Sequence, residues 1–194
     1  MTPYPNLGPV PDLAHYRVTG YEPGAGVLRR VLWYLINAAV FATSIVPLSA
    51  PKRALLRAFG AQVGAGVVLK PRISIKHPWR LHIGAHSWIG EGVWIDNLVQ
   101  VTIGANACLS QGALVLTGNH DYNSRTFELL TRPVNVDDGA WIGAKAIVCP
   151  GVTVGRNAVV TVGSVLTRDA EPEGVYAGNP AQRIRTRRIR ADVA

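Results

Sequence analysis

Charged residues and cysteines are scarce in this sequence. Only 16% of the 194 residues are charged, against 48% that are hydrophobic, and this balance excludes a disordered chain and a coiled coil. Cys108 and Cys149 have no spacing typical of a metal site or a disulfide framework, so we interpret them as buried thiols in a reducing cytosol. Residues 1–18 lack a continuous apolar core, so we expect no secretory signal peptide and a cytoplasmic protein.

The sequence also lacks a glycine-rich loop of the nucleotide-binding type, so neither ATP nor NAD is predicted as a cofactor. A net charge of +8 invites a nucleic-acid interpretation, but the repetitive middle of the chain is nearly neutral. Five arginines crowd the end of the chain, where a basic tail can hold a phosphorylated cofactor, an anionic membrane or nothing in particular. We therefore expect no nucleic-acid partner. These tail residues are Arg183, Arg185, Arg187, Arg188 and Arg190.

An aliphatic residue recurs every six positions through the middle of the chain, and the fourth residue after it is usually small. A period of six fits neither an α-helix nor an ordinary hairpin. Three such units would form one triangular coil of a parallel β-helix, in which each coil buries its apolar side on the next. The repeat slips by two residues twice and is interrupted once. Its members are Val63, Leu69, Ile75; Ile83, Ile89, Ile95; Ile103, Leu109, Val115; and Val136, Ile142, Val148, Val154, Val160, Leu166.

The sequence therefore predicts a mainly β chain in three parts. An N-terminal extension with an apolar helix covers residues 1–62, and the β-helix covers residues 63–175. A C-terminal loop and basic tail cover residues 176–194. An excursion loop at 119–135 interrupts the β-helix. Such excursions cost a solenoid only modest closure entropy, and they often carry binding groups.

The N-terminal extension contains an apolar stretch at residues 31–48, flanked by arginine and lysine residues. Eighteen residues is the lower limit for a membrane span, and Pro47 breaks the end of the stretch. Three alternatives stay open: a helix packed on the protein, a helix in the membrane interface, or a span. A peripheral contact would involve residues 28–59. A second helix is predicted at 51–59, ending before Gly60.

The repeat, together with TGNHDY at residues 117–122, resembles the hexapeptide-repeat acyltransferases, which fold as left-handed parallel β-helices. The apolar helix of the extension, followed by LLRAFGAQVGAGVVLKPRISIKHPWRLHIG at residues 55–84, is similar to the colanic-acid type of O-acetyltransferase. The resemblance implies a homotrimer with active sites between neighbouring subunits. It also implies that His120 is the general base, a role that suits histidine near neutral pH. Taken alone, a loop histidine is more often a surface residue. Asp121 would orient the loop or the imidazole, or be solvated.

Residues 137–169 and VYAGNPAQRIRTRR at 175–188 resemble the acetyl-CoA-binding half of this family. The resemblance places an aromatic residue beside the pantetheine, unless that residue packs in the trimer. Small residues would let the thioester approach the backbone, and a closing loop with an arginine would hold a CoA phosphate. The residues implied are Trp141; Gly143, Ala144 and Ala146; and Asn179, Pro180, Ala181 and Arg183.

Asp96 and Asn97 lie where relatives place polar residues that contact the acceptor, although Asn97 could equally be a turn asparagine at a corner. A related β-helix family, the γ-class carbonic anhydrases, binds zinc through three histidines, two of them five residues apart. His120 has no such partner, so we expect no metal.

The resemblance implies an acetyl-CoA-dependent O-acetyltransferase, with acetyl-CoA as co-substrate. The acceptor would be a sugar hydroxyl of an exopolysaccharide, capsule or glycolipid precursor. Transfer would be direct, within a ternary complex, because no nucleophilic serine or cysteine motif is evident. The alternatives are a xenobiotic or other small-molecule acetyltransferase, and a noncatalytic β-helix trimer that serves as a scaffold.

Overall fold

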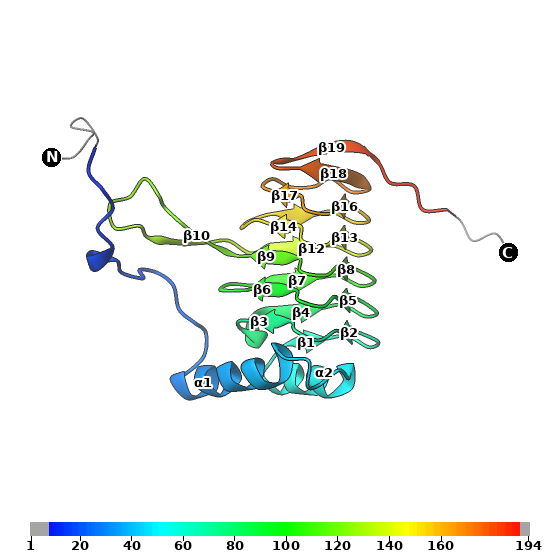
Figure 1. Ribbon diagram of the computed structural model, residues 1–194, viewed down its shortest axis with the longest axis horizontal. Coiled ribbons are helices and arrows are strands. Elements are labelled where there is room, and N and C mark those ends of the chain that lie inside the picture. The colour runs from blue at the N-terminus through cyan, green and yellow to red at the C-terminus, as the bar shows by residue number, and fades with distance from the viewer. Residues whose placement is uncertain (1–7, 191–194) are drawn as a thin grey trace.

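A computed structural model describes residues 8–190 of the chain, and its main body is a triangular prism of stacked coils (Figure 1). Three parallel sheets form the walls. The first wall contains β1 (Gln62–Val63), β4 (Leu81–Ile83), β7 (Val101–Ile103), β12 (Val134–Val136) and β15 (Thr153–Val154). The second wall contains β2 (Val68–Leu69), β5 (Trp88–Ile89), β8 (Cys108–Leu109), β13 (Trp141–Ile142), β16 (Val159–Val160) and β18 (Gly174–Gly178), with β19 (Ala181–Thr186) antiparallel at its end. The third wall contains β3 (Ser74–Ile75), β6 (Trp94–Asp96), β9 (Leu114–Leu116), β14 (Ile147–Val148) and β17 (Val165–Leu166).

The predicted repeat is confirmed position by position. Every aliphatic member of the repeat lies inside the prism and is at most 9% exposed. Successive members fall on the first, second and third walls in turn, so Val63, Leu69 and Ile75 begin the three stacks. The fold is therefore a β-solenoid whose core is one column of aliphatic side chains.

The two slips in the repeat fall at the corner between the third and first walls. Their extra residues widen this corner, and in the first coil they include a 3-10 turn, η3 (Pro78–Arg80). The excursion leaves from the same corner one coil later, as an arm of two antiparallel strands, β10 (Gly118–His120) and β11 (Leu129–Thr131). The chain re-enters the first wall at Val134, slightly earlier than the predicted end of the excursion. We call the corner between the third and first walls the arm corner.

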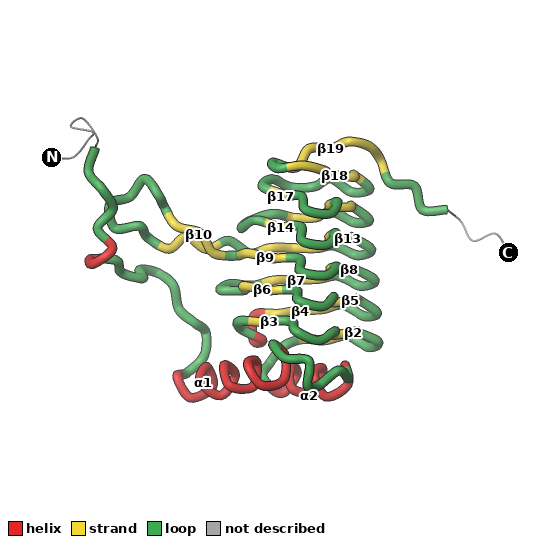
Figure 2. Tube along the Cα trace, in the orientation of Figure 1, coloured by secondary structure: helices red, strands yellow, loops and turns green. Residues whose placement is uncertain are grey.

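Two helices lie across the N-terminal end of the prism (Figure 2). α1 (Val27–Ile36) runs into a short π-helix, η2 (Asn37–Phe41), and α2 (Ser49–Ala58) follows. We call α1, η2 and α2, with the connection between them, the base. Its side chains bond the open edge of the first coil: Trp33 Nε1 donates to Ile75 O at 2.8 Å, and Arg53 donates to Val67 O at 2.7 Å. The base therefore closes a sheet edge that would otherwise be free to pair with another chain.

The observed α2 lies close to the helix predicted at 51–59 and ends before Gly60. The apolar stretch forms α1 and η2, and no helix within residues 8–190 has both the length and the apolar character needed to cross a bilayer. Its inner side chains Trp33 and Phe41 are buried on the prism. Before α1, residues 8–26 form a strap that includes one short 3-10 turn, η1 (Leu13–His15), and runs between the arm and the base (Figure 1).

Candidate functional site

The arm is anchored by a polar side chain at its root. Thr117 is fully buried, and its hydroxyl donates to Asp96 O at 2.9 Å in the coil below. The same hydroxyl accepts a hydrogen bond from Val99 N at 3.3 Å. From this root, β10 and β11 pair from Gly118 and Thr131 to His120 and Leu129. His120 therefore lies at the outer end of a short hairpin whose root is fixed to the prism.

The His120 ring is held in one orientation by Phe127. Imidazole Nδ1 lies 2.9 Å from the Phe127 carbonyl oxygen, and the two rings stack with centroids 4.4 Å apart and planes 7° apart. Phe127 has a left-handed backbone, with φ of 53°, which is uncommon for an aromatic residue. Because a carbonyl can only accept, Nδ1 carries the proton in this contact. In the neutral ring, Nε2 is then left with a free lone pair, as a general base requires.

Asp121 shapes the turn of the arm. Its backbone N–H donates to Glu128 O at 2.9 Å, and its carboxylate accepts from Asn123 N at 3.0 Å. Within residues 8–190, no hydrogen bond joins this carboxylate to the His120 ring. Of its predicted roles, orienting the loop is the one that these contacts support.

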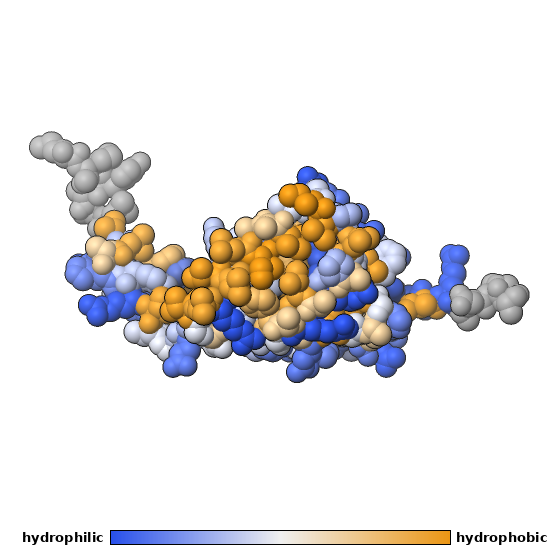
Figure 3. Space-filling model, turned by 90° about the horizontal axis from the view of Figure 1, so that it is seen from below, coloured by the Kyte–Doolittle hydropathy of each residue, from blue (hydrophilic) through white to orange (hydrophobic). Residues whose placement is uncertain are grey.

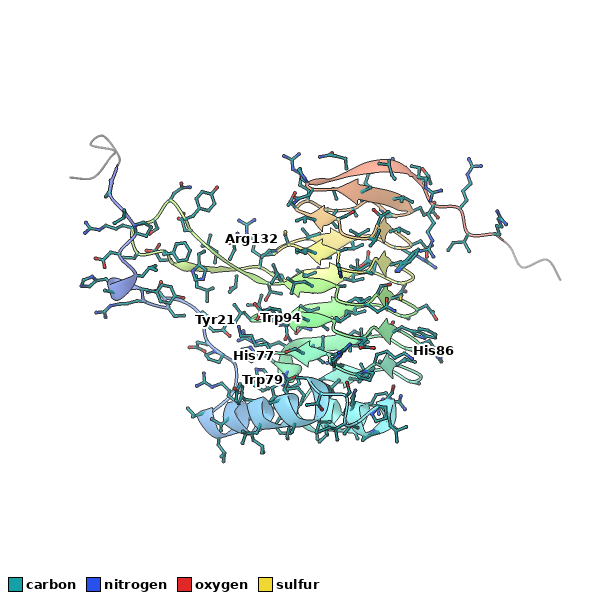
Figure 4. The ribbon with its side chains drawn as sticks, viewed as in Figure 1. Tyr21, His77, Trp79, His86, Trp94 and Arg132 are labelled. Carbon is teal, nitrogen blue, oxygen red and sulfur yellow. The ribbon has the colours of Figure 1, made fainter. Side chains whose placement is uncertain are left out.

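The strap passes close to His120, a relation that no repeat or motif in the sequence signals. Asp12 N donates to Arg125 O at 2.7 Å on the arm, and the Tyr16 ring lies 5.7 Å from the His120 ring. Further along, the Tyr21 hydroxyl lies 3.4 Å from His77 Nδ1 at the arm corner (Figure 4). The strap therefore connects the arm to the lower coils.

Asn97 is fully buried at the arm corner, and its amide is fully occupied by the neighbouring coil. Its Oδ1 accepts from His77 N at 3.0 Å, and its Nδ2 donates to His77 O at 2.6 Å and to Arg80 O at 3.1 Å. The acceptor contact of Asn97 stays a prediction, and in this structure its side chain holds the corner together. It matches the alternative of a turn asparagine.

Asp96, in contrast, lines a cavity of about 330 Å³ between α1 and the third wall. Its carboxylate pairs with Lys76 Nζ at 2.9 Å and is 16% exposed. His77 lines the same cavity and stacks on Trp79 with ring centroids 4.9 Å apart. Burial, with the positive charges of Arg80 and Lys76, lowers the pKa of His77 to about 4, so this ring is neutral near pH 7.

A groove runs along the outside of the second wall. One hollow of about 630 Å³ is lined by Trp141, Gly143 and Ala144, and a second of about 420 Å³ shares Ser110 and Gln111 with it. Trp141 is 45% exposed, and its Nε1 donates to Ser110 Oγ at 2.8 Å. The predicted pantetheine residues on β13 and just after it therefore do lie together on one surface.

Two of the predicted small residues serve the coil stack. A Cβ at Gly143 would lie 2.6 Å from Val162 N and 2.7 Å from Val160 O, so glycine is required there by the next coil. Ala146 is fully buried in the core and does not line the groove. The cofactor contact of Ala146 stays a prediction, and in this structure the fourth residue of the hexad fills the inside of a corner.

Arg183 lies away from the groove. It pairs with Glu171 at 3.4 Å, beside a separate cavity that Pro180 and Ala181 also line. Arg185 and Arg188 line the groove instead. The cause is an irregularity in the β18–β19 pairing, where Tyr176 faces Arg183 and its neighbour Val175 faces Arg185. The extra residue between the two arginines, Ile184, reverses the alternation that regular strands follow.

Asn179 is exposed in the turn between β18 and β19, and it precedes Pro180. This turn is on the side of the hairpin where Arg183 lies, and none of its residues lines the groove. The closing-loop residues and Trp141 are thus not brought together within the described chain.

His120 and the groove lie on different sides of the prism. The arm leaves between the third and first walls, whereas Trp141 and Gly143 lie on the second wall and the corner after it. Figure 1 shows the arm extending away from the strands of the second wall. Within the described chain, His120 and the groove therefore do not face each other.

The expected absence of a metal site stays a prediction. Among residues 8–190, no group of three or more histidine, cysteine or carboxylate side chains is close enough to hold a metal ion. Cys108 and Cys149 are both free and half-buried, slightly more open than the buried thiols that we predicted.

No protein-family model matches the chain. Among curated proteins, the putative colanic acid biosynthesis acetyltransferase of Escherichia coli is 35% identical over 176 residues, which cover 91% of this chain and 97% of that protein. The galactoside O-acetyltransferase of Escherichia coli is 31% identical over 137 residues, 69% of this chain and 68% of that protein.

Two solved structures share the fold. A hexapeptide-repeat acetyltransferase from Vibrio cholerae, solved with acetyl-CoA, has a TM-score of 0.76 and 24% identity, over 86% of this chain and 92% of that chain. A galactoside acetyltransferase in complex with CoA has a TM-score of 0.72 and 24% identity, over 82% of this chain and 80% of that chain.

Proposed function

Because the chain belongs to the hexapeptide-repeat acetyltransferases, we propose that it transfers an acetyl group from acetyl-CoA to a sugar hydroxyl. The acceptor that we propose is a sugar of an exopolysaccharide, capsule or glycolipid precursor. The relative named for colanic acid biosynthesis supports this choice, because its similarity extends over the N-terminal extension as well as the coils. The observation that carries the proposal is the His120–Phe127 contact, which makes Nε2 the nitrogen without a proton in the neutral imidazole.

His120 is the general base in this proposal. Its Nε2 takes the proton of the sugar hydroxyl while that oxygen attacks the thioester carbonyl carbon. The tetrahedral intermediate then breaks its C–S bond, and the imidazolium returns the proton to the departing CoA sulfur. The Phe127 carbonyl stabilises the imidazolium, since it accepts the Nδ1 proton in both charge states. Base catalysis of this kind contributes roughly 10²–10⁴-fold in rate.

The groove on the second wall is the proposed acetyl-CoA site. Trp141 offers an aromatic face to the pantetheine, and Arg185 and Arg188, which line the same groove, bind the CoA phosphates in this proposal. Guanidinium groups bind phosphate through charge-assisted hydrogen bonds. We assign this role to Arg185 and Arg188 in place of Arg183, which faces the other way and pairs with Glu171.

The proposed assembly is a homotrimer with active sites between subunits. Its support is the separation of His120 from the groove, which leaves the site incomplete in one chain. A neighbouring prism could place its groove beside the arm. Asp96 lines a cavity near the arm corner and is the proposed acceptor contact.

The test measures free CoA thiol released from acetyl-CoA with a panel of nucleotide sugars and oligosaccharides. We expect acceptor-dependent release that falls roughly 10²–10⁴-fold in His120→Ala, with an unchanged melting temperature and unchanged CoA affinity. The control is His82→Ala, on the first wall away from the arm, which should keep full activity. Absence of CoA binding in the wild type would refute the transferase and favour a scaffold.

A mixing experiment tests the shared site. His120→Ala chains and Arg185→Ala chains would each be weak alone. If each site takes His120 from one chain and the groove from another, refolding the two variants together restores part of the wild-type turnover. If both parts come from one chain, the mixture stays as weak as its components, and the shared site is refuted.

A further inference from the structure

The outer side of α1 is an apolar surface that the described chain leaves uncovered. Val27, Val31 and Leu35 are spaced by four residues, and Leu28 and Leu32 lie beside them on the same side of the helix. These five side chains are between 48% and 82% exposed, whereas Trp33 on the opposite side is 2% exposed. Single exposed apolar residues are ordinary, but a continuous patch marks an interaction site.

The patch continues beyond α1. Ile45 and Leu48, in the connection to α2, are 79% and 67% exposed. Viewed from the helical end, the molecule shows a broad hydrophobic surface there, with hydrophilic residues at its edges (Figure 3). Because the base lies across the end of the prism, its patch points along the prism axis, away from the walls.

The charge around the base has one sign. Residues 23–90 contain nine lysine and arginine residues and no aspartate or glutamate. The rest of the chain contains eleven basic and twelve acidic residues, so this segment carries a charge of +9 and the rest a charge of −1. Arg29 and Arg57 are exposed on α1 and α2, whereas Lys52 is buried and donates to Lys70 O at 3.0 Å. An apolar patch on a segment that has cations and no acidic residue complements an anionic lipid surface.

We propose that the base is a docking face for an anionic bilayer. α1 lies in the plane of the headgroups, with its apolar stripe at the boundary of the acyl chains and its arginines at the level of the phosphates. The contact is peripheral, since α1 has ten residues. Exposed side chains of the second wall, such as Trp88 and Trp141, point sideways from the prism. Prisms packed side by side would therefore leave their bases free and facing one plane.

Docking would favour acceptors that are carried on a lipid. The Asp96 cavity lies between α1 and the third wall, and Tyr34 of α1 is one of its lining residues. A sugar in that cavity would lie beside the helix that contacts the bilayer. This step rests on the proposed transferase function, whereas the docking itself does not.

The experiment is flotation of the full chain with vesicles of phosphatidylcholine, alone or mixed equally with phosphatidylglycerol. We expect the wild type to float with the mixed vesicles, less so as salt is raised. The double variant Leu28→Asp/Leu32→Asp should lose at least about tenfold in the floated fraction, because two carboxylates would oppose both the acyl chains and the anionic headgroups. The matched control is Ile184→Asp, which replaces a 58% exposed aliphatic residue at the other end of the prism and should float as the wild type does.

Three results would overturn the proposal. The first is a wild type that stays at the bottom with both kinds of vesicle. The second is a double variant that floats as well as the wild type does. The third is a wild type that forms assemblies larger than a trimer in solution while the double variant does not, which would mean that a second copy covers the patch. CoA release with a water-soluble acceptor, measured without vesicles, should be equal in both proteins. Failure of docking is therefore distinguishable from failure of catalysis.

Discussion

The prism and the arm are built on different principles. In the prism, the aliphatic side chains of the repeat stack on equivalent side chains of neighbouring coils and are at most 9% exposed. In the arm, His120 and Leu129 are half-buried, Leu130 is 48% exposed, and the hairpin is positioned by single polar contacts at Thr117 and along the strap. Stability is thus concentrated in the regular part, and the proposed chemistry in the irregular part that it carries.

The largest effect on stability is expected from a substitution in the prism that leaves the arm unchanged. Ile103→Ala should reduce the free energy of unfolding by about 2–5 kcal/mol, because the residue is fully buried in the middle of the stack. Leu130→Ala removes a half-exposed aliphatic side chain from the arm and should cost less than about 0.5 kcal/mol. Chemical denaturation of both variants at the same protein concentration checks the pair. Equal losses would mean that the arm contributes to the core as much as a coil does.

A smaller effect is expected where the two parts join. Asn97→Ala removes three hydrogen bonds from a fully buried corner and leaves the His77 and Arg80 backbone groups unpaired. The expected loss is about 1–3 kcal/mol of stability. Asn97→Asp should lose more, because a carboxylate oxygen would then face the two carbonyls to which Nδ2 donates.

Denaturation curves and acceptor KM values for the two Asn97 variants separate this role from acceptor binding. If Asn97 contacts the acceptor, its replacement would raise the acceptor KM and leave the stability unchanged. Asn97→Asp as stable as the wild type would show that the amide does not hold the corner.

The regular part could be predicted from the sequence because its signal repeats. A period of six is enough to assign Val63, Ile83 and Ile103 to one wall, and the extra residues after Ile75 and Ile95 mark one corner. His120 stood out because it breaks the period. In each case the position in the sequence fixes the place in space, since neighbouring coils constrain one another.

The rest depends on contacts without a period. Arg183 and Arg185 should share a side in a regular strand, and only the irregular pairing with Val175 and Tyr176 separates them. Asn97 is a turn residue in either interpretation, and its burial is decided by the backbone of His77 in the coil below. The exposed stripe of α1 was ambiguous because both sides of that helix are apolar.

The last expected effect concerns the contact between the strap and the arm. Tyr16 of the strap lies with its ring 5.7 Å from that of His120, tilted by 59°. A contact between aromatic rings contributes about 0.5–1.5 kcal/mol, which corresponds to a roughly two- to tenfold change. Tyr16→Leu should therefore lower kcat by that factor. The KM for acetyl-CoA should stay unchanged, because the strap supplies none of the described residues that line the second-wall groove. Tyr16→Phe keeps the ring and should behave as the wild type does.

The pH dependence of kcat identifies what Tyr16 does. As a positioning residue, it restricts the imidazole to the orientation in which Nδ1 faces the Phe127 carbonyl, 2.9 Å away. Its removal should lower kcat by the same factor at every pH, because the population of that orientation changes and the protonation chemistry does not. A shift of the profile along the pH axis would instead show that Tyr16 acts on the protonation of His120. A loss in Tyr16→Phe equal to that in Tyr16→Leu would assign the effect to the hydroxyl, and the ring contact would then have no part in holding the base.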